Sequence, residues 1–130
     1  MTAEEIVGDL PDLTTDDVRE ETRMASEDLR ASWKRTEAFL LDARSHLSQL
    51  AEALCADEIA EFHGYLEHNE LELALDMLDV VLEMSELEEL RVVELMALAA
   101  ASMGETERQE RYDKHLSKAR GWEYQTKWSP

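Results

Sequence analysis

Apolar residues recur at steps of three and four through most of the chain, which is the spacing of an amphipathic α-helix. The longest such stripe begins at Val18 and continues to Leu54. Its members are Val18, Thr22, Ala25, Leu29, Trp33, Thr36, Leu40, Ala43, Leu47, Leu50 and Leu54. Thr14 or Thr15 is a suitable N-cap for this segment. The pattern therefore predicts one long N-terminal helix, with a kink near Ser45 as the place where it would divide.

Further helices are predicted after the long stripe. One opens near Asp57 and turns Ile59, Phe62 and Leu66 inward. The helices after it lie near residues 70–83, 86–103 and 107–119. No segment shows the sustained two-residue alternation of a half-buried strand. We therefore predict an all-α fold of stacked helical hairpins, a bundle of about five helices with a long N-terminal helix.

Residues with capping chemistry support these boundaries. Gly104 and Gly121 stand where a left-handed residue would end a helix. Three residue pairs match the capping box, in which a side chain caps the helix and an acid or amide three residues later caps it in return. These pairs are Asn69 with Glu72, Ser85 with Glu88, and Thr106 with Gln109.

The helix predicted near residues 70–83 has an unusual distribution of charge. Its charged residues after the first position fall on one narrow ribbon, while apolar residues cover the rest of its circumference. The members of this acidic ribbon are Glu72, Asp76, Asp79 and Glu83. The following helix is apolar from Leu95 to Met103. We interpret these two helices as the core and the acidic ribbon as its exposed edge.

Length and composition favour one folded domain. The chain has 130 residues, of which 44% are hydrophobic and 34% charged, and this is typical of a globular protein. We expect a flexible N-terminus at residues 1–13, a single helical domain at 14–120 and an aromatic tail at 121–130. The tail holds three of the eight aromatic residues. The favoured interpretation is that it folds back over the long first helix, and the alternative is a set of binding anchors.

The sequence also indicates a compartment. The start of the chain lacks the basic and apolar regions of a signal peptide. No window approaches the roughly 18 apolar residues of a membrane span. Cys55 is the only cysteine, so an internal disulfide is excluded. We therefore expect a cytoplasmic protein.

Charge is concentrated in the middle of the chain. From Ser45 through Leu90 there is no Lys or Arg, and the same 46 residues hold thirteen Asp and Glu. The net charge is −7 over residues 1–56, −12 over 57–103 and +1 over 104–130, which gives the total of −18. Such a field disfavours nucleic acid and anionic membranes as partners and steers basic proteins into contact. The two interpretations are a solvated surface that aids solubility and a binding surface for a basic protein.

The sequence contains no recognisable catalytic motif. The scattered glycines exclude a phosphate-binding loop, and no nucleophile motif surrounds Cys55. The histidines are His46, His63, His68 and His115, and none has the Glu three residues earlier that a di-iron helical bundle requires. The alternating acidic loop of a calcium site is also missing. We therefore expect no enzymatic activity, no metal and no cofactor.

The stretch from Phe62 to Leu78, FHGYLEHNELELALDML, resembles a known family. The acidic turn Tyr65-Leu66-Glu67-His68-Asn69-Glu70 and the run Leu73-Ala74-Leu75 are similar to those of small helical immunity proteins of bacterial polymorphic toxin systems, the MafI-type family in particular. The resemblance covers roughly residues 58–104. The long first helix and the tail have no counterpart in it. The hairpin also resembles half of a tetratricopeptide unit, but the next unit does not follow.

The resemblance implies an immunity protein, or antitoxin, that binds and neutralises a cognate bacterial toxin, with a basic nuclease as the expected kind. Such a protein needs an acidic surface, no disulfide and no catalysis. The expected partner-binding residues are Asp57, Glu58, Glu61, Glu67, His68, Asn69, Glu70, Glu72, Asp76, Asp79 and Glu83. The alternative is a helical adaptor or secretion chaperone that acts as a homodimer through the Val18–Leu54 stripe. A third possibility is a transcription-related helical module that acts through protein contacts.

Overall fold

A computed structural model describes residues 12–86 and 89–129, with side chains from Glu27 onward. The chain divides into two compact units, Met1–Ala31 and Ser32–Pro130. In the first unit the described residues are helical and belong to α1, which spans Asp12–Ser45. The predicted flexible stretch at residues 1–13 lies almost wholly outside the described residues. The side chains of the first three stripe members lie outside them as well.

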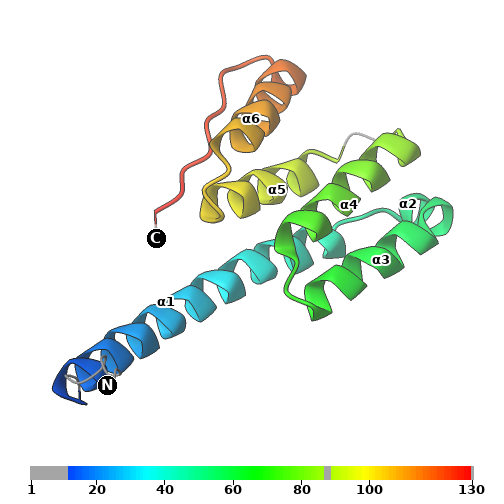
Figure 1. Cartoon of the computed structure of the whole chain (residues 1–130). Coiled ribbons are helices and arrows are strands. Elements are labelled where there is room, and N and C mark those ends of the chain that lie inside the picture. The colour runs from blue at the N-terminus through cyan, green and yellow to red at the C-terminus, as the bar shows by residue number, and fades with distance from the viewer. Residues whose placement is uncertain (1–11, 87–88, 130) are drawn as a thin grey trace. The chain divides into compact units, whose positions relative to one another are not determined.

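The described residues form six α-helices and no strand, which confirms the all-α prediction (Figure 1). After α1, the helices are α2 (Gln49–Leu54), α3 (Ala56–Glu67), α4 (Leu71–Ser85), α5 (Leu90–Ser102) and α6 (Thr106–Arg120). Within Ser32–Pro130, α3 packs on α4 and α5 packs on α6 as two hairpins, and α4 joins them by contacting α5. The long apolar stripe therefore corresponds to two helices, α1 and α2, and not to one.

The division falls just after Ser45, where the sequence places a kink. Ser48 caps α2, and its Oγ accepts a hydrogen bond from the backbone N–H of Ala51 at 3.1 Å. The interruption shifts which residues face the core. Leu50 and Leu54 are 52% and 54% exposed, contrary to their predicted place in the stripe, and Ala51 and Cys55 are buried instead.

The α3–α4 hairpin follows the sequence prediction in its core and departs from it at the turn. Ile59, Phe62 and Leu66 are buried, as predicted. Asn69 does not cap α4, because its φ of 57° places it in the left-handed conformation that ends the preceding turn. Glu70 holds the N-cap position and makes no side-chain capping bond. The register of α4 is therefore set by its buried apolar face.

The core is formed mainly by α4 and α5, as predicted. Their buried side chains are Leu71, Ala74, Leu75, Leu78, Val81, Ser85, Val92, Val93, Leu95, Met96, Ala97, Ala99 and Ala100. Gly104 and Gly121 have φ of 76° and 80°, which confirms them as left-handed helix terminators. The other two predicted capping boxes are wrong. Ser85 is the last residue of α4 and Thr106 the first residue of α6, so neither holds an N-cap position.

The C-terminal tail runs back from α6 and contacts α1, in agreement with the favoured interpretation. The ring of Trp128 meets that of Phe39 edge-on, with centroids 5.4 Å apart. The guanidinium of Arg35 lies 5.9 Å from the centre of the same Trp128 ring. Thr126 is buried and donates its backbone N–H to Asp113 at 3.0 Å, and its hydroxyl to the other oxygen of that carboxylate. The tail is thus part of the folded unit.

Candidate functional site

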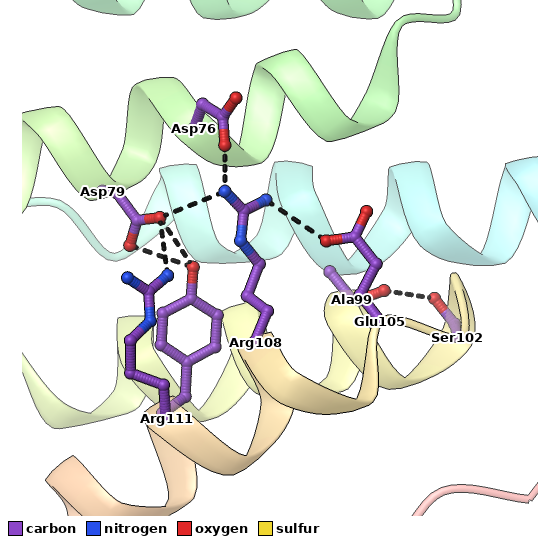
Figure 2. Close-up of polar contacts among 8 residues, drawn as sticks. Asp76, Asp79, Ala99, Ser102, Glu105, Arg108 and Arg111 are labelled. Carbon is purple, nitrogen blue, oxygen red and sulfur yellow. Dashed lines mark hydrogen bonds and ion pairs between the residues drawn. The ribbon is translucent and has the colours of Figure 1, made fainter.

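The acidic ribbon of α4 lies against α6, which brings arginines to its centre (Figure 2). Arg108 pairs with Asp76 and lies 3.6 Å from Asp79. Arg111 lies 3.4 Å from Asp79. The hydroxyl of Tyr112 donates to the Asp79 carboxylate, with 2.9 Å to each oxygen. We call this set of contacts the α4–α6 seam.

The seam overturns one inference from the sequence. Asp76 and Asp79 are half-buried and ion-paired within the chain, so the centre of the ribbon is not an open edge. Burial raises the pKa of Asp79 and outweighs the Tyr112 hydrogen bond and the arginine charges, which act to lower it. Burial, together with the negative charge of Asp79, also raises the pKa of Tyr112. The sequence prediction failed here because the charge on α4 does not show which side chains α6, two helices later in the chain, places against it.

Two carboxyl groups face each other at the start of the seam. Glu105 precedes α6, and its Oε2 is buried without a hydrogen-bond partner among the described residues. Burial raises the pKa of Glu105 to about 6, and the nearby carboxyl group of Glu72 contributes to this shift. Arg108, 3.6 Å from the other oxygen of Glu105, acts in the opposite sense.

The acids of α3 have a different environment from those of α4. Asp57, Glu61 and Glu67 are exposed, and Glu58 is half-buried. Glu70 is exposed at the turn that follows. No ion pair joins any of these five to another described residue. We call them the α3 acidic face; unlike the acids at the centre of the ribbon, its members are not ion-paired with arginines of the described residues.

The turn between α3 and α4 holds the two polar residues that the sequence adds to the site. His68 and Asn69 are both exposed. The Nδ1 atom of His68 lies 2.9 Å from the carbonyl oxygen of Gly64, one turn back on its own helix. The ring is therefore oriented by its own helix, with Nε2 on its other side. The two remaining ribbon acids, Glu72 and Glu83, are exposed at opposite ends of the ribbon.

Arg108, Arg111 and Tyr112 were not singled out from the sequence. A signal for them exists, because Glu105, just before α6, and Arg108 and Tyr112, on α6, are spaced three and four apart. The acids of α4 have a similar spacing, so two such helices side by side bring opposite charges together at successive turns. The pairs of the seam follow the same order along both helices, because Asp76 pairs with Arg108 and Asp79, further along, pairs with Arg111. An arginine-bearing face of this spacing is the feature that could have been matched to the ribbon.

Other kinds of site find little support in the described part of the chain. No group of three or more His, Cys, Asp or Glu residues there is arranged to hold a metal ion. Burial raises the pKa of the Cys55 thiol, which disfavours the reactive thiolate. No helix among the described residues is long and apolar enough to cross a membrane.

No protein-family model matches this chain, and neither the curated proteins nor the solved structures give a match. The resemblance to immunity proteins therefore rests on the sequence of roughly residues 58–104 alone.

Proposed function

We propose that the protein is an immunity protein, or antitoxin, that binds a basic protein toxin and blocks its action. The observation that carries this proposal is the α3 acidic face, five carboxylates along α3 and the turn after it that have no ion pairs with described residues. A one-signed exposed surface raises the rate at which an oppositely charged protein associates. A nuclease must bind phosphates and so tends to have a basic cleft, which makes it the kind of toxin best matched to this surface.

The α3–α4 hairpin supplies a rigid base for such a surface. Phe62 and Leu66 are buried on the inner side of α3, so the acids on its outer side are held by the core. The turn adds His68 and Asn69 as hydrogen-bonding groups beside Glu67 and Glu70. Charges give the fast encounter, and the directional groups of the turn give specificity.

A homodimeric adaptor or secretion chaperone is the second candidate, and one observation favours it. Leu50 and Leu54 are more than half exposed on α2, four residues apart on one face of that helix. Apolar residues at this spacing can cover a groove or meet a second copy. Light scattering on the purified protein separates the two candidates, because the adaptor is expected to be a stable dimer and the inhibitor a monomer.

Co-expression tests the immunity proposal directly. The reading frame beside the gene for this chain is expressed alone and together with it. Growth arrest by the neighbour alone, relieved by this chain, is the expected result, and the two proteins should purify as a complex whose association rate falls with salt. A neighbour that is harmless, or whose toxicity this chain does not relieve, contradicts the proposal.

A further inference from the structure

The pairing along the α4–α6 seam stops one turn before the end of the acidic ribbon. Arg108 forms an ion pair with Asp76. Asp79 is paired with Arg111 and accepts a hydrogen bond from Tyr112. Glu83, the next acid of the ribbon, has no ion pair with any described residue. The next α6 position in this register is His115, where the earlier turns have arginines. The chain therefore repeats an acid–arginine pairing along two helices and leaves the last acid without an arginine.

A pocket of about 390 Å³ lies at this position, between α4, α5 and α6. Its apolar walls are Leu82, Val93 and the ring of Tyr112, and its carboxylates are Asp79, Glu83 and Glu89. Arg111 and His115 complete the α6 side. This volume is near the lower end of the ~300–1,000 Å³ range of pockets that hold small ligands. It suits one long side chain better than a large molecule.

The polar groups of the pocket differ in how far they are already satisfied. Asp79 is held by Tyr112 and two arginines, so it has little capacity for another cation. Glu89 accepts one long hydrogen bond, 3.4 Å from the backbone nitrogen of Ser48. Most of the hydrogen-bond acceptor sites on the carboxylates of Glu83 and Glu89 therefore remain open. The unsatisfied charge of the pocket is therefore negative.

We infer that this pocket receives an arginine side chain of the protein partner, next to Glu83. An arginine has an apolar stem, which Leu82 and Val93 can cover, and a planar head that pairs with carboxylates through two hydrogen bonds. A lysine of the partner would lack this planar head. An apolar side chain of the partner would leave Glu83 without an ion pair. The partner's arginine completes the series that Arg108 and Arg111 begin within the chain. This inference rests on the proposed function, because it assumes a basic protein partner.

Nuclear magnetic resonance tests the pocket without the partner. The ¹⁵N-labelled full-length chain is titrated with N-acetyl-arginine amide, and with the lysine and citrulline amides as probes of charge and head shape. We expect shifts confined to the amides near Leu82, Glu83, Val93 and Tyr112, with arginine the tightest probe. Glu83→Gln should weaken arginine binding by roughly tenfold, as expected for the loss of a charge-assisted hydrogen bond. Glu107→Gln is the matched control, because Glu107 is an exposed acid of α6 outside both the pocket and the α3 acidic face, and the change should leave binding at the pocket unaltered.

Three outcomes overturn the inference. They are shifts spread over all acidic helices, equal binding of the lysine or citrulline amide, and unchanged arginine binding in Glu83→Gln. Circular dichroism of that variant verifies that α4 is intact.

Failure of the pocket is distinguishable from failure of the proposed function. If Glu83→Gln still relieves toxicity in co-expression as well as the unaltered chain, the pocket is not the anchor although the immunity function holds. If the pocket binds arginine but no toxin is neutralised, the immunity function fails.

Discussion

The hydroxyl group of Tyr112 lies 2.9 Å from both carboxylate oxygens of Asp79. Tyr112 belongs to α6 and is buried, whereas Asp79 belongs to α4 and is half-buried. This contact ties α6 to α4 through a partly buried polar pair, beside Arg108 and Arg111. A hydrogen bond in such a setting matters chiefly through the cost of removing it, because the remaining partner stays desolvated.

Tyr112→Phe is therefore expected to lower the free energy of unfolding by about 1–2 kcal/mol. The ring remains in place, so the loss reports the hydroxyl group alone. Urea unfolding followed by circular dichroism measures it. Tyr124→Phe is the matched control, because the structure shows no hydrogen bond from the Tyr124 hydroxyl to a described residue, and it should leave stability almost unchanged. Equal effects of the two substitutions would contradict the role assigned to the Tyr112–Asp79 contact.

Stability should depend on pH through Glu105. Its pKa in the folded state is about 6, against an ordinary value of 4.5, because burial and then Glu72 raise it. Between these two values the folded state binds more protons than the unfolded state. The stability that Glu105 contributes is therefore present below pH 4.5 and is lost as the pH rises through 6. Glu105→Gln keeps a neutral hydrogen-bonding group at every pH. The variant should exceed the unaltered chain in stability by about 1 kcal/mol at pH 7 and match it near pH 4.

Urea unfolding at a series of pH values gives this comparison. Glu107→Gln is the control, because Glu107 is an exposed acid two residues further along. A constant difference between Glu105→Gln and the unaltered chain from pH 4 to 7 would show that Glu105 titrates normally. Other carboxyl groups titrate in the same range, and for this reason the prediction concerns the difference between two proteins.

Charge reversal separates the two groups of acids. Asp57→Lys combined with Glu61→Lys should reduce the rate of association with a basic toxin by roughly tenfold or more, without loss of stability. Asp76→Lys combined with Asp79→Lys should instead destabilise the fold, because it places lysines against Arg108 and Arg111. Association rates by surface plasmon resonance and melting temperatures by circular dichroism provide both readouts. An unchanged association rate in the Asp57 and Glu61 variant would remove the α3 acidic face from the binding surface.

The tail should be held by Thr126. Its hydroxyl and its backbone N–H both bind the buried carboxylate of Asp113. Thr126→Val keeps the shape and removes the hydroxyl, which leaves one Asp113 oxygen without that donor. We expect the protection of the Tyr124 and Thr126 amides against hydrogen exchange to fall by roughly tenfold. Gln125→Ala, at an exposed neighbour, is the control, and equal protection in the two variants would argue against this anchoring role.

The parts of the fold that follow from apolar spacing could be predicted from the sequence. Ile59, Phe62 and Leu66 face the core because a three- and four-residue period leaves a helix only one way to bury them. Leu54 was placed wrongly because the helix is interrupted before Ser48, which rotates the following residues and brings Cys55 inward instead. The residue at which a helix restarts depends on its cap and on the neighbouring helices. The spacing of apolar residues alone predicts neither of these.

The candidate site was less predictable for a related reason. The ribbon of acids was found correctly, but the environment of Asp76 and Asp79 depends on Arg108, 32 residues later in the chain than Asp76. A sequence gives the charge on each helix, and the packing decides which charges meet. Asp57 and Glu61 lie on the outer side of α3, so the exposure expected for them did not depend on a distant partner.

The segment without Lys or Arg has a practical consequence for finding the partner. Trypsin cleaves only after these two residues, so α2, α3 and α4 remain within one long fragment between Arg44 and Arg91. Amine-reactive crosslinkers have no lysine to modify on these helices, and a conventional crosslinking experiment would report no contact with them. A carbodiimide instead activates carboxyl groups and joins them directly to amines. With that reagent, every crosslink to these helices pairs one of their acids with an amine elsewhere, and lysines of a basic partner would reveal themselves by their position along α3.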